Sequence, residues 1–314
     1  MTTTELDLVA GYDALREGAA AAPLSRDAIR VEGPDTATYL QGQLSQDVAA
    51  LAVGGTTWSF LLQPQGKVDA WMRVHRLADD AFLLDVDAGA GAVVEARLRR
   101  FLLRTKADIS PVGPLVALAL RGPGTASEAA ADSLVADSLI ADGVLARLPA
   151  GWPGVAGFDV LAHAVSPGDV PLAPAEALEA LRIEAGVPVT GHELTDRTIP
   201  AEVGQWVIDA SVSFTKGCYT GQELVARIDS RGGNVPRPVR GLVVEGTTVP
   251  PRGAAVHDAA DKEVGAISSS ARSPRLGVVA LAIVARDVEV PGEVRVVWDG
   301  ASAAAEVRTL PLVP

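Results

Sequence analysis

The chain has 314 residues, of which 48% are hydrophobic and 21% charged, and its formal net charge is −12. This length exceeds the size at which one hydrophobic core usually stops growing, so we expect more than one domain, and the acidic balance argues against strong non-specific nucleic-acid binding. The single cysteine, Cys218, excludes an internal disulfide and a four-cysteine metal or cluster site, and the four histidines stand at no metal-ligand spacing, so we expect no bound metal.

The first 235 residues mix helical and strand patterns, which indicates an α+β region. A strand, a short helix and a buried strand are expected first, with Tyr39 and Leu40 facing inward. A turn and a hairpin partner strand follow, then a helix with an arginine-rich end. The expected elements are strands at 27–32, 58–62, 67–77 and 116–120, helices at 36–44, 88–102 and 174–185, helix then strand within 125–150, and an irregular stretch at 186–205.

From about residue 240 the pattern changes to short strands separated by Gly/Pro turns. That rhythm is typical of a small antiparallel barrel. The Gly/Pro-rich stretch that begins at Arg231 is the expected linker. We therefore predict one region over residues 1–235 and a C-terminal β-barrel domain over residues 240–314.

The segment 212–227 carries the sharpest local signals. A strand at 212–214 is expected to meet a helix that runs from Gly221 to about residue 228. Thr220 and Glu223 have the spacing of a capping box, and Tyr219 and Leu224 have the spacing of a hydrophobic staple. These signals predict a helix that begins directly after Thr220.

Cys218 then lies two residues before the helix cap, where free N–H groups and the helix dipole favour a thiolate. Lys216 adds a cation, and Gly217 and Gly221 leave room for a ligand. Two interpretations stay open: a reactive thiol or anion-binding turn, and a buried structural cysteine at a strand–helix junction.

Two carboxylates are further candidates. Glu184 lies in the last turn of its helix, where the dipole disfavours a carboxylate by about 0.3–1 kcal/mol, so it either binds a ligand or pairs on the surface with Arg182 or a distant arginine. Lys67 and Asp69 are two apart on a strand and share a face. They either meet a ligand jointly or form a solvated pair.

The chain start has no basic segment before an apolar core, and no apolar run is long enough to span a membrane. With one cysteine, this indicates a cytoplasmic protein of a reducing compartment, with no membrane partner.

Several motifs together resemble one family. The segment Lys216-Gly-Cys-Tyr-Thr-Gly-Gln-Glu223 carries the pattern K-G-C-[FY]-x-G-Q-E, and weaker matches occur in the right order at 31–47, 62–67, 182–188 and 264–282. These residues resemble the YgfZ family, relatives of the glycine-cleavage T-protein, an aminomethyltransferase. The resemblance covers about residues 25–290.

The resemblance implies an aminomethyltransferase-like folate-binding fold, with lobes around a central channel and tetrahydrofolate as ligand; residues 1–235 would form two of the lobes. It also implies support of iron–sulfur cluster assembly or repair, a link to tRNA modification, and transient contact with iron–sulfur client or assembly proteins. The site residues that it suggests are Cys218, Lys216 and Asp69 for catalysis, and Glu184, Arg182, Tyr219 and Gly217 for folate binding.

One departure affects the chemistry. The T-protein carries an acidic pair on its first hairpin, whereas this chain has Asp69 followed by Ala70. Three hypotheses stay open. The first is an iron–sulfur accessory protein with a reactive thiol, the second is a folate-dependent aminomethyl or one-carbon transferase, and the third is a folate-regulated binding module with an inert thiol. Slow alkylation of Cys218 at pH 7 would favour the third.

Overall fold

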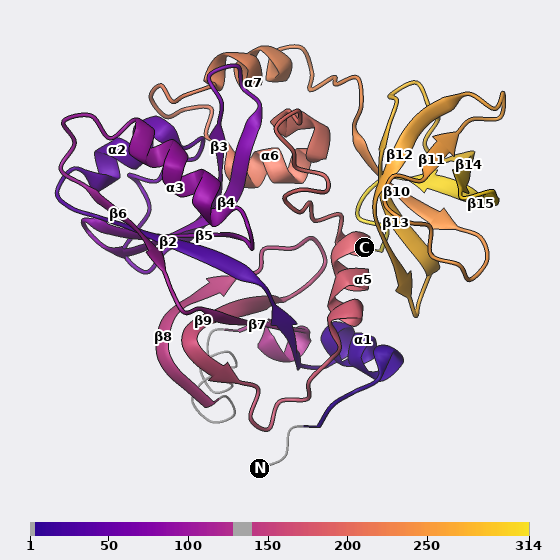
Figure 1. Ribbon diagram of the computed structural model, residues 1–314, viewed down its shortest axis with the longest axis horizontal. Coiled ribbons are helices and arrows are strands. Elements are labelled where there is room, and N and C mark those ends of the chain that lie inside the picture. Colours follow the sequence, from indigo (N-terminus) through magenta and orange to yellow (C-terminus); the bar gives the residue numbers. More distant parts are fainter. Residues whose placement is uncertain (1–3, 128–139, 314) are drawn as a thin grey trace. The chain divides into compact units, whose positions relative to one another are not determined.

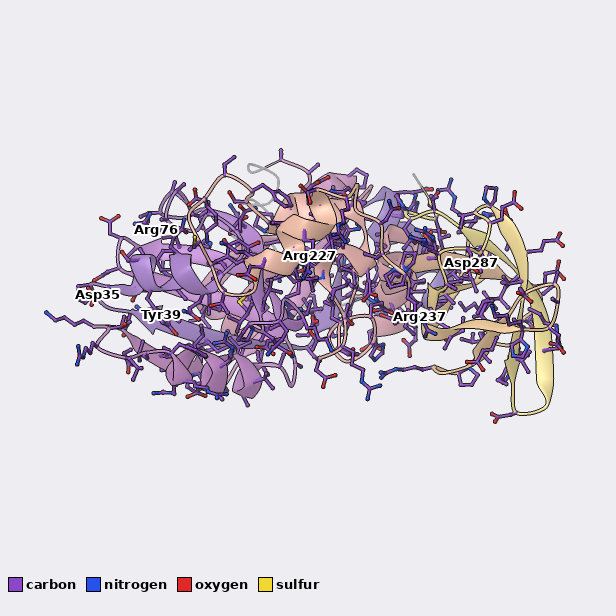
Figure 2. All side chains as sticks on the ribbon, turned by 90° about the horizontal axis from the view of Figure 1, so that it is seen from above. Asp35, Tyr39, Arg76, Arg227, Arg237 and Asp287 are labelled. Carbon is purple, nitrogen blue, oxygen red and sulfur yellow. The ribbon has the colours of Figure 1, made fainter. Side chains whose placement is uncertain are left out.

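The structure, a computed structural model, describes residues 4–127 and 140–313 (Figure 1), and Figure 2 shows their side chains on the same ribbon. The chain forms two compact units, each assembled from separate stretches. Unit 1 comprises residues 1–24, 117–188 and 236–314, and unit 2 comprises residues 25–116 and 189–235. The division into residues 1–235 and 240–314 stays a prediction.

Unit 2 is built on a five-stranded antiparallel sheet in the order β3-β4-β5-β2-β6. Leu40, Met72, Leu84 and Val94 are fully buried in its core, because the apolar sides of α2 and α3 pack against the sheet. Its elements are β2 (Arg26–Glu32), α2 (Thr36–Gln43), β3 (Thr56–Leu62), β4 (Val68–Ala78), β5 (Ala81–Asp87), α3 (Gly91–Arg100), β6 (Asp108–Val112), η3 (Pro200–Val203), α6 (Gln205–Ser211) and α7 (Gln222–Asp229).

Unit 1 contains a four-stranded sheet in the order β1-β7-β9-β8 and a closed six-stranded barrel in the order β10-β13-β12-β11-β14-β15. Helix α5 packs against α1 and β12 within this unit (Figure 1). The elements are α1 (Leu8–Glu17), β1 (Ala20–Leu24), β7 (Val116–Arg121), η1 (Pro123–Thr125), β8 (Ile140–Pro149), β9 (Gly157–Ser166), α5 (Ala175–Ala185), β10 (Val239–Val244), β11 (Ala255–His257), β12 (Glu263–Ser273), β13 (Gly277–Val284), β14 (Gly292–Trp298) and β15 (Ala301–Arg308).

The barrel confirms the strand rhythm predicted from residue 240 onward, and the helix that ends at Gly186 is also confirmed. Gly186 adopts the left-handed conformation, with φ 71°, that ends a helix favourably. Tyr39 and Leu40 face the core of unit 2 as predicted, at 8% and 0% exposed. The helix expected within 125–150 falls largely on residues outside the described part, and its following strand is β8.

One sequence prediction near residue 212 is wrong, and one helix was missed. Residues 212–214 form no strand, because the Val212 N–H still bonds to Ile208 O at the end of α6 and Ser213 N–H bonds to Ser45 O. Helix α6, which the sequence did not predict, is held on the sheet by Trp71, which donates to Ser211 Oγ at 2.8 Å and meets Trp206 edge to face. These aromatic contacts join segments far apart in sequence, so no local pattern reveals them.

Candidate functional site

Residues 212–221, called here the cysteine loop, are anchored by Lys216. Its Nζ atom donates to the carbonyl oxygens of Gln41, Leu44 and Gln46 at 2.7, 2.7 and 2.8 Å. The end of a helix leaves carbonyls without intrahelical partners, and an ammonium group offers three donors, so the two are matched at the end of α2. All three N–H groups of this lysine are therefore used in fixing the loop.

Partial burial lowers the pKa of Lys216 to about 8, and the nearby negative charge of Asp47 opposes that shift. The ammonium form therefore predominates at pH 7. Its Nζ atom also lies 5.3 Å from the centre of the Tyr219 ring, within cation–π range. The structure thus gives Lys216 an anchoring role, and its predicted role in activating the thiol stays a prediction.

The thiol of Cys218 is exposed. It is therefore not the buried structural cysteine that the sequence left open. A Cβ placed on its neighbour Gly217 would meet nothing within 4 Å, so the loop is open on that side. Tyr219, the next residue, turns inward and is 9% exposed, and burial raises its pKa to about 12.

Helix α7 does not begin as the sequence predicts. Its cap is Gly221 in the left-handed conformation, with φ 83°, and not Thr220 with a capping box. The Tyr219 N–H instead donates to Gln222 Oε1 at 3.1 Å. A Cβ on Gly221 would lie 2.5 Å from Gln63 O, so this glycine allows close packing against the hairpin turn and leaves no room for a ligand.

Asp69, on β4, has a different partner from the one its strand spacing suggested. Its Oδ2 atom accepts a hydrogen bond from Arg97 Nε at 3.1 Å, and both side chains are largely buried. Arg97 comes from the arginine-rich end of α3, and its Nη2 atom also donates to Leu62 O at 3.2 Å. Asp69 is therefore paired with Arg97 of helix α3.

Asp69 also lines a cavity of about 260 Å³, together with Asp196 and Thr190. This volume is just under the usual range for small-molecule pockets, roughly 300–1,000 Å³. The buried Oγ1 atom of Thr190 has no hydrogen-bond partner within the described residues. The Thr190 N–H donates to Asp87 Oδ2 at 2.8 Å, which fixes this wall of the cavity.

The second predicted carboxylate, Glu184, belongs to unit 1 and is 1% exposed. Its Oε2 atom accepts from the Tyr12 hydroxyl at 2.6 Å and lies 3.7 Å from Arg16 Nη1. Its other oxygen, Oε1, is buried and has no hydrogen-bond partner in the part of the chain that is described. Glu184 is therefore a buried carboxylate whose Oε1 atom could accept a hydrogen bond from a ligand. The alternative of a surface glutamate is wrong.

Arg182 does not pair with Glu184. Its guanidinium donates to both carboxylate oxygens of Glu179, at 2.8 and 2.6 Å, and to Val187 O at 2.5 Å.

Tyr12, the partner of Glu184, has a raised pKa. Burial of its hydroxyl and the hydrogen bond to Glu184 both raise this pKa above its usual range. Sequence reasoning missed Tyr12, Arg97 and Thr190, because each reaches its partner from a distant segment.

The predicted site residues divide between the two units. Cys218, Lys216, Gly217, Tyr219 and Asp69 belong to unit 2, whereas Glu184 and Arg182 belong to unit 1. Within residues 4–127 and 140–313, no group of three or more His, Cys, Asp or Glu side chains could hold a metal ion. Among the helices described, none is long and apolar enough to cross a membrane.

Comparisons with known proteins agree on one family. A family model of the glycine cleavage T-protein C-terminal barrel domain matches residues 237–314. Aminomethyltransferase from Thermus thermophilus is 30% identical over 306 residues, which cover 90% of this chain and 84% of that protein. The tRNA-modifying protein YgfZ from Edwardsiella ictaluri is 30% identical over 221 residues, which cover 66% of this chain and 65% of that protein. The crystal structure of glycine cleavage system aminomethyltransferase T from Bartonella henselae has a TM-score of 0.75 and 22% identity, and covers 98% of this chain and 89% of that chain.

Proposed function

Because this chain belongs to the aminomethyltransferase-like family, which joins the glycine cleavage T-protein and the YgfZ proteins, we propose that it binds tetrahydrofolate and supports iron–sulfur cluster assembly or repair through Cys218. The observation that carries the proposal is the exposed thiol on a loop that Lys216 fixes by three hydrogen bonds. A thiol in a fixed, open loop is suited to meeting the surface of another protein.

The folate part of the proposal depends on Glu184. A reduced pterin ring presents amino and ring N–H donors, and the buried Oε1 atom of Glu184 is an acceptor without a partner in the described residues. Leaving such an atom unpaired is costly, so a ligand donor there gains a hydrogen bond to a charged group, worth about 1.5–3 kcal/mol. Tyr12 and Arg16 hold the carboxylate in place through its other oxygen. The residues present therefore fit a folate, which when bound carries one-carbon units.

A single thiolate cannot hold an iron–sulfur cluster alone. In the proposed function, Cys218 supplies one ligand while a client or assembly protein supplies the others, so the contact is transient. The link to tRNA modification is then indirect. A net charge of −12 opposes direct binding of tRNA. We therefore propose that the link to tRNA modification runs through tRNA-modifying enzymes that receive iron–sulfur clusters.

The test uses a strain that lacks this protein. Wild type should restore the activity of iron–sulfur enzymes, and Cys218→Ser should not, because serine has nearly the same size but is a far poorer soft ligand. Unchanged thermal unfolding and folate affinity of the purified variant would show that only the thiol chemistry was lost. Full restoration by Cys218→Ser would contradict the proposal.

A second candidate, a folate-dependent aminomethyl or one-carbon transferase, is favoured by the position of Asp69 in its cavity. Two observations weigh against it: Ala70 replaces the second carboxylate, and Arg97 already holds Asp69. Assays of folate-dependent aminomethyl transfer with wild type and Asp69→Asn separate the two functions. Transfer by wild type that is lost in Asp69→Asn would establish the transferase.

A further inference from the structure

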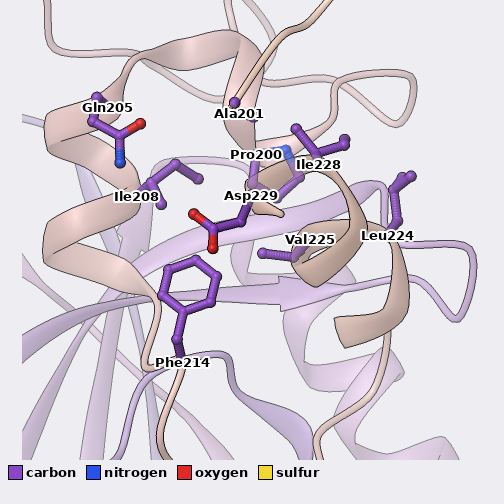
Figure 3. Close-up of a pocket in the computed structure, with 10 residues that line it drawn as sticks. Pro200, Ala201, Gln205, Ile208, Phe214, Leu224, Val225, Ile228 and Asp229 are labelled. Atoms are coloured by element: carbon purple, nitrogen blue, oxygen red, sulfur yellow. The ribbon is translucent and has the colours of Figure 1, made fainter. Parts of the chain in front are cut away.

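Unit 2 carries a small apolar groove beside the cysteine loop. Its walls come from η3, α6, α7 and the loop itself, and its apolar lining residues include Ile208, Phe214, Val225 and Ile228 (Figure 3). Phe214 is 49% exposed, which is unusual for a large aromatic side chain. These residues, with Leu224 and Asp229, are called the Phe214 groove below.

Asp229 is the charged residue among those that line the groove. It is an exposed residue at the end of α7, and its carboxylate points into the groove beside Ile208 and Phe214 (Figure 3). Neither a hydrogen bond nor an ion pair engages this carboxylate within the described residues. This exposed carboxylate therefore stands next to apolar side chains that line the same groove. A cation brought next to it, with apolar atoms around, would meet complementary charge and surface.

The size of the groove selects the kind of occupant. Its volume is about 20 Å³, far below the roughly 300–1,000 Å³ of small-molecule pockets. Such a hollow admits the tip of one side chain and excludes a cofactor. A membrane surface is a poor match as well, since anionic lipid headgroups would face Asp229 and a chain of net charge −12.

We propose that the Phe214 groove docks a partner protein through an aliphatic or aromatic side chain that stands next to a Lys or Arg. Only the tip of the apolar side chain enters the hollow, and the cation pairs with Asp229 while its methylene stem covers Phe214. Surrounding apolar contacts exclude water from that ion pair, which makes it a favourable anchor.

The groove is tied to the thiol by the chain itself. Phe214 and Cys218 are four residues apart in the cysteine loop, and the anchored Lys216 lies between them. This placement identifies the docked partner as the protein whose thiol or cluster meets Cys218, an identification that rests on the proposed function. The docking contact itself does not use the thiol.

The probe is a library of random heptapeptides displayed on phage, selected on wild type and counter-selected on Asp229→Lys. We expect enrichment of sequences with an aliphatic or aromatic residue beside Lys or Arg. A selected peptide, made with a fluorescent label, should bind Asp229→Lys and Phe214→Ser about tenfold or more weakly than wild type by fluorescence polarisation. No enriched sequence, or enrichment without a basic residue, would overturn the proposal.

Matched controls separate the groove from general surface effects. Asp80→Lys makes the same charge change at an exposed hairpin position, and Leu103→Ser removes an apolar side chain that is 83% exposed. Both should bind the peptide like wild type. Sedimentation of wild type with phosphatidylserine vesicles, lost in Phe214→Ser, would overturn the proposal in favour of a membrane.

The outcome also distinguishes this inference from the proposed function. Cys218→Ser should bind the selected peptide with unchanged affinity, because docking does not use the thiol. If Asp229→Lys binds the peptide as wild type does, the groove proposal fails while the loss of cluster support in Cys218→Ser still stands. If Cys218→Ser restores iron–sulfur enzymes fully and Asp229→Lys loses the peptide, the docking site survives and the assigned partner does not.

Discussion

Gly221 and Gln63 are packed backbone to backbone: a Cβ placed on Gly221 would lie 2.5 Å from the carbonyl oxygen of Gln63. The contact brings together two segments that carry the family resemblance, the hairpin turn at 63–66 and the signature segment at 216–223. A Cβ on Gly66 would in turn lie 2.5 Å from Leu224 Cβ. Two glycines with positive φ thus let the hairpin turn and the start of α7 touch.

Gly221→Ala should destabilise the protein by about 2–4 kcal/mol, because the new Cβ meets backbone atoms and the left-handed conformation disfavours alanine. Gly217→Ala is the control, since its Cβ would meet nothing and its φ is not in the left-handed region. That variant should stay within about 0.5 kcal/mol of wild type. Urea unfolding measures both, and equal effects would contradict the packing described.

Lys216→Met should cost about 1–3 kcal/mol of unfolding free energy, because the loss of three hydrogen bonds to backbone carbonyls outweighs the relief of the desolvation that lowers the pKa of this lysine. Methionine keeps the length of the side chain. Lys106→Met removes an exposed lysine from the same unit and should change stability by less than about 0.5 kcal/mol. A similar small loss for Lys216→Met would show that the three bonds contribute little.

Stability should fall as the pH rises above about 10, the ordinary pKa of tyrosine. The chain has three tyrosines, and burial raises the pKa of Tyr39 and Tyr219 to about 12 and that of Tyr12 higher. A raised pKa means that the folded state keeps protons which the unfolded state has lost, so the stabilisation is complete below pH 10 and is lost as the pH rises through about 12. Absorbance at the phenolate band should show little ionisation at pH 10.5 in the native protein, and marked ionisation after unfolding. Equal ionisation in both states would contradict the burial of these hydroxyl groups.

Glu184→Gln should weaken tetrahydrofolate binding about tenfold to a hundredfold, since the lost charge removes most of one charge-assisted hydrogen bond. The amide has the same shape, so the bond from Tyr12 has an acceptor in the variant. Glu17→Gln, an exposed substitution on α1, is the control and should leave affinity unchanged. Calorimetric titration of the purified proteins gives both values, and wild-type affinity in Glu184→Gln would remove this residue from the folate site.

The sequence predicts those parts of the fold that local patterns determine. The barrel strands, the helix that ends at Gly186 and the inward positions of Tyr39 and Leu40 follow from periodicity and turn chemistry. It fails where a distant contact prevails over a local preference. Thr220 is a good helix cap by type, but close packing against Gln63 moves the cap to Gly221.

The candidate site shows the same contrast. Glu184 could be singled out because its helix position opposes the dipole, and it proves to be buried, with one oxygen that has no hydrogen-bond partner among the described residues. Its partner Tyr12 carries no comparable signal, since nothing in the first twenty residues indicates a contact with residue 184. Arg97 was interpreted through its own helix dipole, whereas its position is fixed by Asp69.

The ammonium of Lys216 bonds to a carbonyl 175 positions earlier in the chain. At a synthesis rate of about 5–20 residues per second, α2 leaves the ribosome roughly 10–35 s before the lysine that secures its end. Residues 117–188, which belong to unit 1, are made during that interval. The cysteine loop therefore acquires its shape late in translation, and a nascent chain that stops before residue 216 carries only part of unit 2 and lacks this contact.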